Sequence, residues 1–171
     1  LPIRRLQSAC RQAETPLGAP FKNSGTGSGE SYKQAVTEPD TWKSHSERNM
    51  SDENAARSLF VSGVSALDRG DFASAIPFFE GTLAVLPKSV PTLLNLMFCY
   101  IQLKKFADAI QFANCVRSID QNNTEALHAL AFLYKEVSRN DLSLDALDRL
   151  LSLDSNNVSA LNNKGALLNT I

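Results

Sequence analysis

Residues 56–89, ARSLFVSGVSALDRGDFASAIPFFEGTLAVLPKS, decide the fold that the sequence predicts. Their pattern of small and apolar residues returns 34 residues later and then again, so that Gly63, Met97, Ala131 and Gly165 are evenly spaced. A constant period between 20 and 50 residues is typical of a repeat array. The same offset aligns two further sets, which are Ala75, Ala109 and Ser143, and Phe79, Ala113 and Leu147.

Each copy contains two stretches of helical periodicity separated by a polar turn. In the first copy, apolar residues recur at spacings of three and four from Ala55 to Asp68, which predicts one amphipathic helix with its N-cap at Ser51. A second helix is expected from about Phe72 to Val85, where Pro87 ends it. The sequence thus predicts helical hairpins.

Small residues inside the first copy indicate how its two helices would pack. Gly63 and Ala75 lie on the apolar stripes that face each other. Small side chains at such a crossing let two helices approach closely, and we expect the ring of Phe79 to fill the space beside them.

The later copies span residues 90–123 and 124–157, and a partial copy spans 158–171. The near-identical linkers that end at Asn123 and Asn157 supply an asparagine in front of the next helix, where it can cap the first turn. The expected inner stripes of these copies are Leu93, Leu96, Met97 and Tyr100, then Leu127, Leu130, Ala131 and Tyr134.

Composition and net charge argue against several classes of partner and site. The net charge is −1, from 17 basic and 18 acidic residues, which argues against nucleic acid or a charged membrane surface as the partner. No apolar run reaches the roughly 20 residues of a membrane span. Three cysteines without metal-ligand spacing favour a reducing compartment, so we expect a cytoplasmic protein. No metal site, cofactor or catalytic set is predicted, because His128 has only surface acids near it.

The first 49 residues differ in composition from the repeats that follow. Gly, Pro, Ser and Thr occupy 18 of these 49 positions, which predicts a disordered head or linker before an array over 50–171. The arginine-containing stretch 1–12 is a weaker candidate for the remnant of an organelle-targeting segment.

The repeated residues resemble the tetratricopeptide repeat. The first copy supplies the family's apolar, small, aromatic and proline positions with Leu59, Gly63, Ala75, Phe79 and Pro87, while Ala66 replaces an expected aromatic residue. The resemblance implies an all-α solenoid of stacked antiparallel helix pairs, wound into a right-handed superhelix with a concave groove. The residues that it implies as the partner-binding lining of that groove are Phe60, Val64, Leu67, Leu94, Asn95, Phe98, Ile101, His128 and Phe132.

The resemblance also suggests two known modes of peptide binding, and the sequence departs from both. Relatives that hold a chaperone C-terminal tail use a lysine, asparagine and arginine clamp, of which only Asn95 has a counterpart here. Glu125 stands at a clamp position and would repel a carboxylate, so a chaperone tail is not the expected partner. Asn95 and Asn163 resemble part of the asparagine ladder in O-linked N-acetylglucosamine transferase, but Ala129 interrupts it.

These observations predict an adaptor or scaffold without catalytic activity that holds a peptide or helix of a partner protein in a largely apolar groove. Two alternatives stay open. In the first, the array precedes an enzyme domain, such as a glycosyltransferase, in a longer protein. In the second, the chain associates with itself through its open C-terminal helix, on which Leu161, Leu167, Leu168 and Ile171 lack a covering helix.

Overall fold

The computed structural model describes residues 41–169, with side chains from Met50 onward, and every regular element in that part is a helix. The predicted all-α fold is therefore confirmed. The helices are α2 (Thr41–Asp68), α3 (Phe72–Val85), α4 (Val90–Gln102), α5 (Phe106–Ile119), α6 (Thr124–Glu136), α7 (Asn140–Leu153) and α8 (Val158–Leu168).

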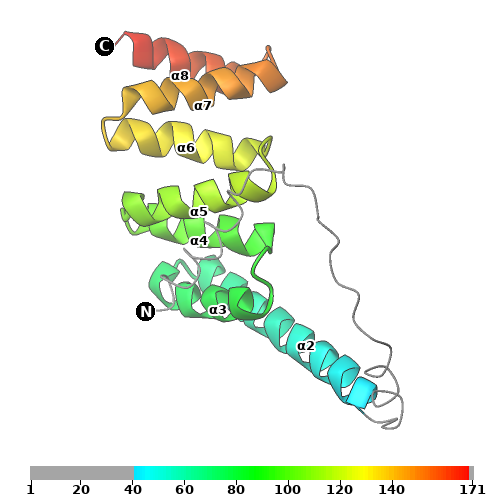
Figure 1. Cartoon of the computed structure of the whole chain (residues 1–171). Coiled ribbons are helices and arrows are strands. Elements are labelled where there is room, and N and C mark those ends of the chain that lie inside the picture. The colour runs from blue at the N-terminus through cyan, green and yellow to red at the C-terminus, as the bar shows by residue number, and fades with distance from the viewer. Residues whose placement is uncertain (1–40, 170–171) are drawn as a thin grey trace, which may run out of the picture.

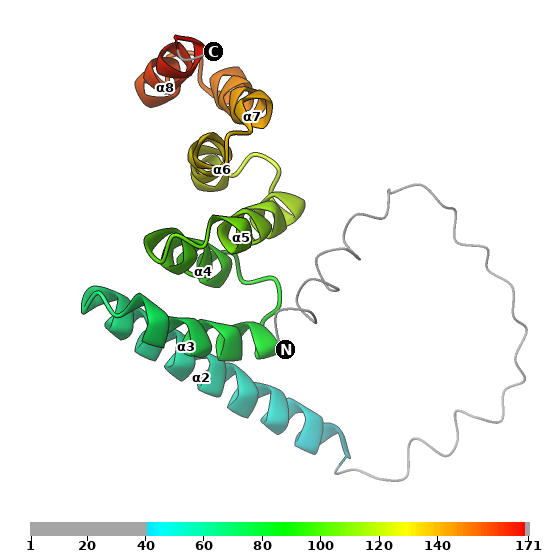
Figure 2. The same ribbon diagram turned by 90° about the vertical axis from the view of Figure 1, so that its left-hand side faces the viewer.

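The helices form a stack of antiparallel hairpins in which each helix contacts the next one along the chain (Figure 1). The pairs α2–α3, α4–α5 and α6–α7 are the three predicted units, and α8 is the first helix of the fourth. In Figure 2 the helices α2 and α3 run across the view, whereas α7 and α8 are seen nearly end-on. The hairpins therefore rotate along the stack, as in a superhelix.

Helix α2 begins earlier than the sequence predicted. It starts at Thr41 rather than after an N-cap at Ser51, so residues 41–49 belong to a helix and not to a disordered head. Its first turns extend beyond the end of α3 (Figure 1). Because that part of α2 lacks an apolar stripe, hydrophobic periodicity gave no indication of it. The prediction of disorder for residues 1–40, and of targeting by residues 1–12, lies outside the described residues.

The close approach predicted for the first hairpin is present. Gly63 is buried on α2, and a Cβ atom placed there would lie 2.7 Å from Cε1 of Phe79 on α3. A second contact of this kind joins Gly81 to Leu59, where an added Cβ would meet Cδ1 at 3.0 Å. Both glycines lie where the side chain of the facing helix takes the space that a methyl group would occupy.

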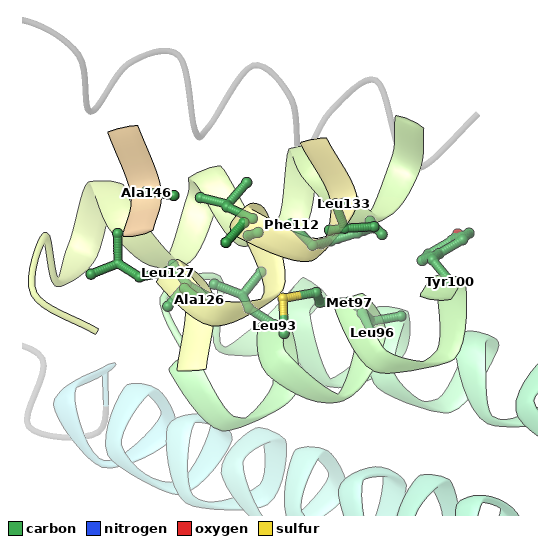
Figure 3. Close-up of a cluster of buried hydrophobic side chains, with 14 of the residues drawn as sticks. Leu93, Leu96, Met97, Tyr100, Phe112, Ala126, Leu127, Leu133 and Ala146 are labelled. Atoms are coloured by element: carbon green, nitrogen blue, oxygen red, sulfur yellow. The ribbon is translucent and has the colours of Figure 1, made fainter. Parts of the chain in front are cut away.

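The predicted inner stripes form one continuous core. All four residues of the stripe on α4 are buried, and on α6 only Tyr134 of the predicted set remains partly exposed. Figure 3 shows part of this core, in which Leu93, Leu96 and Met97 of α4 gather with Phe112 of α5 and with Leu127 and Leu133 of α6. Burial of such leucines contributes roughly 1.5–3 kcal/mol each, which favours stacking of the hairpins over their separation.

A second set of buried residues joins one unit to the next. At two equivalent places on the first helices, α4, α6 and α8 carry Thr92 and Cys99, Ala126 and Leu133, and Ala160 and Leu167, all of them buried. The first unit has Ser58 and Ser65 there, and both are exposed because no hairpin precedes α2 among the described residues. At these two places of the first unit, serines therefore replace the residues that are buried in the later units.

The turns inside the hairpins share one backbone conformation. Gly70, Lys104 and Ser138, which occupy equivalent positions, have positive φ angles of 74°, 56° and 58°. In each turn the next residue's N–H donates to a carbonyl five residues earlier, as in Asp71 N to Ala66 O at 3.0 Å. This is the left-handed helix end that glycine favours, so Gly70 alone adopts it without strain.

The asparagines of the linkers cap the helices as predicted. The side chain of Asn123 accepts a hydrogen bond from the N–H of Ala126 at 3.0 Å, and that of Asn157 accepts one from Ala160 at 2.9 Å. Each therefore satisfies an N–H group at the start of α6 or α8 that has no partner inside the helix.

Candidate peptide-binding face

The residues predicted to bind a partner lie along one side of the first helices, and we call this surface the first-helix face. It consists of Phe60, Val64, Leu67, Leu94, Asn95, Phe98, Ile101, His128 and Phe132. Seven of these nine residues are half-buried. The two exceptions are Phe98 and Phe132, of which 44% and 46% is exposed.

The two exposed rings are held in the same way by the second helix of the preceding unit. Phe98 on α4 makes an edge-to-face contact with Phe72 on α3, with ring centroids 5.8 Å apart. Phe132 on α6 makes the same kind of contact with Phe106 on α5, at 6.3 Å. Each residue of the second pair follows its counterpart by 34 positions. We call these four residues the aromatic ladder (Phe72, Phe98, Phe106 and Phe132).

The ladder fixes the orientation of its exposed rings. Edge-to-face pairs are worth about 0.5–1.5 kcal/mol beyond the apolar area that they bury. Phe98 and Phe132 therefore present apolar surface to the solvent in a held orientation. Covering these two rings costs little of their own side-chain entropy. Phe72 and Phe106 lie on second helices. Groove-lining residues were predicted on first helices alone, so the prediction did not include these two.

The remaining apolar residues of this face pack against the core or against buried rings. The ring of Phe60 contacts Phe79 edge-to-face at 5.7 Å, and Val64, Leu67, Leu94 and Ile101 pack against the core while remaining partly exposed. Much of their surface is thus already covered by the array itself. The largest apolar exposure on the face is at Phe98 and Phe132.

A small pocket lies next to the ladder, between α6, α7 and α8. Its volume is about 70 Å³. The buried part of its lining is apolar apart from Ser143, whose hydroxyl donates to the carbonyl of Ala131 at 2.6 Å. The exposed part of the lining consists of the ring of Phe132, the amine of Lys135 and the amide of Asn163. The lining residues are Ala131, Phe132, Lys135, Ser143, Leu147, Asn163 and Leu167.

The polar residues of the predicted site are separated along the stack. Asn95 is half-buried on α4, and His128 is half-buried on α6. Asn163, two periods after Asn95, is exposed on α8 and lines the pocket. At the remaining places compared with the carboxylate clamp, Phe60 and Val64 are part of the apolar packing, and Glu125 is exposed.

Two buried ionisable groups belong to the core. Burial raises the pKa of the Cys99 thiol to about 11. Burial, with Glu80 and Asp108 nearby, raises the pKa of Tyr100 to about 12, and its ring stacks on Phe112 at 5.3 Å. Both groups are therefore neutral at pH 7. This suits packing and does not suit a nucleophile.

Neither a metal site nor a membrane-spanning helix is found in the described part of the chain. Its His, Cys, Asp and Glu side chains form no group of three or more that would hold a metal ion. Each of the helices within residues 41–169 is too short or too polar to span a lipid bilayer.

The outer side of α8 carries two exposed leucines. Leu161 and Leu168 are 49% and 54% exposed, and a Cβ atom added at Gly165 would meet nothing within 4 Å. The prediction was wrong for Leu167, which is buried because it packs back onto the core of the array. Ile171 lies outside the described residues.

Comparison with known families finds a similarity within the middle of the array. Residues 66–133 match the family model described as tetratricopeptide repeat. This stretch runs from the end of α2 to α6 and contains the whole second unit. Within residues 66–133 the chain is thus similar to the tetratricopeptide repeat, in line with the resemblance of its repeated residues. A search of curated proteins finds no significant match to the chain.

Solved structures agree on the fold. The first such domain of Spaghetti (RPAP3), bound to an HSP90 peptide, has a TM-score of 0.64 and 21% identity over 69% of this chain and 94% of its own. The Arabidopsis OM64 domain has a TM-score of 0.64 and 18% identity, over 70% and 99%. The P58(IPK) domain reaches 0.72 with 20% identity, over 81% of this chain and 39% of its own. Such identities establish the fold alone.

Proposed function

We propose that this protein is an interaction module that holds a segment of a partner protein against its first-helix face, without chemistry of its own. The observation that carries the proposal is the aromatic ladder. It repeats in register with the fold and leaves Phe98 and Phe132 nearly half exposed. Exposed rings held firmly by a neighbour are typical of the anchors that dominate peptide-binding surfaces.

The kind of segment follows from the face itself. Its exposed anchors are aromatic, so the bound segment should carry bulky apolar side chains that cover Phe98 and Phe132. A helix or an extended segment with such side chains can meet both rings, since they recur with the spacing of the units. The array would thus select a partner by an apolar pattern.

A chaperone tail is not the ligand that we propose, although RPAP3 was solved with an HSP90 peptide. The corresponding places on this chain offer the ring of Phe60, the side chain of Val64 and the carboxylate of Glu125. None of these groups donates a hydrogen bond to a terminal carboxylate, and Glu125 repels one. The amide of Asn95 alone would not hold the tail.

Affinity capture tests the proposal. Three full-length baits are compared: the unchanged protein, Phe98→Glu, and the control Ile119→Glu, which alters a residue that is 41% exposed on the last turn of α5. We expect Phe98→Glu to lose partners that the other two baits retain, because a carboxylate on the ladder must be desolvated when a segment binds. All three baits should have the same helical circular dichroism spectrum. Capture of the same partners at the same yield by Phe98→Glu would show that binding occurs elsewhere.

The exposed side of α8 supports a second proposal, association of two copies through Leu161 and Leu168. An open apolar helix face tends to be covered, and the empty space above Gly165 leaves room for a side chain from another helix. We expect Leu168→Asp to reduce association without affecting the ladder. A monomer mass that is independent of concentration in light scattering would contradict this proposal.

A further inference from the structure

We propose that the pocket between α6, α7 and α8 binds the carboxylate of an aspartate or glutamate side chain on the partner segment. The inference rests on the proposed function, because Phe132 belongs to both the pocket and the aromatic ladder. A segment that covers the ladder therefore passes directly beside the pocket.

The size and the inner lining of the pocket suit the end of one side chain. A cavity needs roughly 10–15 Å³ to hold one water molecule, so a volume of about 70 Å³ accepts several atoms. The inner wall is formed by Ala131, Leu147 and Leu167, which are buried and apolar. Methylene groups can lie against this wall while a polar end stays at the opening.

The opening of the pocket favours an anion. Lys135 supplies a cation and Asn163 supplies an amide that can donate hydrogen bonds, and no carboxylate lines the pocket. The ion pairs among residues 50–169 are Arg139–Asp141 and Lys164–Asp148, so Lys135 has no acidic partner there. A ligand carboxylate at this place would meet a positive charge without displacing an existing ion pair.

The pocket also gives the bound segment a direction. The residues equivalent to Lys135 in the first two units are Leu67 and Ile101, which are half-buried and apolar. A cation is thus present at this position only in the third unit. The acidic side chain of the segment should lie at the α8 end of the face, with its apolar side chains toward the first unit.

A peptide library tests this inference with the full chain. The probe is a set of degenerate decapeptides with acetylated N-termini and amidated C-termini, so that Asp and Glu side chains are the only carboxylates. We expect the bound peptides to be enriched in bulky apolar residues and, at one side of them, in Asp or Glu. Lys135→Glu should abolish the acidic enrichment and favour Lys or Arg instead. Lys88→Glu, which reverses an exposed cation outside the pocket, should leave the selection unchanged.

Peptide affinities measure how much the pocket contributes to binding. For one selected acidic peptide, Lys135→Glu should weaken binding about five- to tenfold, as expected for a charge contact of roughly 1 kcal/mol at a partly solvated site. The affinity of Lys135→Gln should lie between those of the unchanged protein and Lys135→Glu. Asn163→Ala should weaken binding about two- to fivefold. The same peptide with Gln in place of its acidic residue should bind the unchanged protein and Lys135→Glu with similar affinity.

The outcomes separate the pocket from the face. Apolar enrichment without an acidic preference would overturn the carboxylate site and leave the proposed function intact. An acidic preference that survives Lys135→Glu would also overturn it, as would binding that appears only when the peptides carry a free C-terminal carboxylate. A library in which nothing is enriched would contradict the proposed function and the pocket together.

Discussion

Gly63→Ala should lower the free energy of unfolding by about 1–3 kcal/mol, although alanine is the better helix former. The added methyl group would lie 2.7 Å from Cε1 of Phe79, closer than carbon atoms can approach. Phe79 is fully buried and its ring also contacts Phe60, so it has no free space into which to move. The gain of roughly 1 kcal/mol in helix propensity is therefore outweighed by the displacement of α2 from α3. Urea unfolding followed by circular dichroism at 222 nm measures the change.

Gly165→Ala is the matched control, because it makes the same substitution at the equivalent position of α8. A Cβ atom there meets nothing within 4 Å, so only the propensity gain remains and stability should rise by up to about 1 kcal/mol. The two variants should thus change stability in opposite directions. A neutral or stabilising Gly63→Ala would mean that the first hairpin packs less closely than described. Combining Gly63→Ala with Phe79→Leu should recover part of the loss, since the smaller side chain relieves the contact.

The sequence predicted the hairpins and most of the core because both depend on residues that recur at a fixed interval. Leu96 and Leu130 align through the period, and each lies in the buried stripe of its helix. The contacts between units were missed for a physical reason. They involve residues such as Leu133, whose equivalent in the first unit is the exposed Ser65, because α2 has no preceding hairpin to cover it among the described residues. Comparing later units with each other, without the first, would have revealed them.

The positions that make up the candidate face were predicted in part, whereas its role in binding stays a prediction. Phe98 and Phe132 were expected on the first-helix face from the family resemblance, and the structure places both there with large exposed surfaces. Their partners, Phe72 and Phe106, depend on how the second helix of one unit crosses the first helix of the next, which residue spacing does not determine. The pocket beside Phe132 needs three helices to be placed relative to one another, so no linear pattern indicated it.

Leu96→Ala should have the larger effect on stability, a loss of about 2–4 kcal/mol. Leu96 is fully buried in the inner stripe of α4, and its removal leaves a cavity as well as less buried apolar surface. The surrounding helices are held by hairpins on both sides, which limits how far they can close around the cavity. In a repeat array each unit is stabilised largely by its neighbours, so damage to the middle unit weakens two interfaces at once.

The control for Leu96→Ala is Leu161→Ala, which removes the same atoms from a leucine that is 49% exposed on α8. This variant should change stability by less than about 0.5 kcal/mol, because about half of the Leu161 side chain already contacts water. Both are compared by urea unfolding, in which the midpoint should fall for Leu96→Ala with little change in slope. Equal losses for the two leucines would contradict the burial of Leu96. A smaller slope for Leu96→Ala would indicate that the units no longer unfold together, as expected if the middle hairpin couples the two ends of the stack.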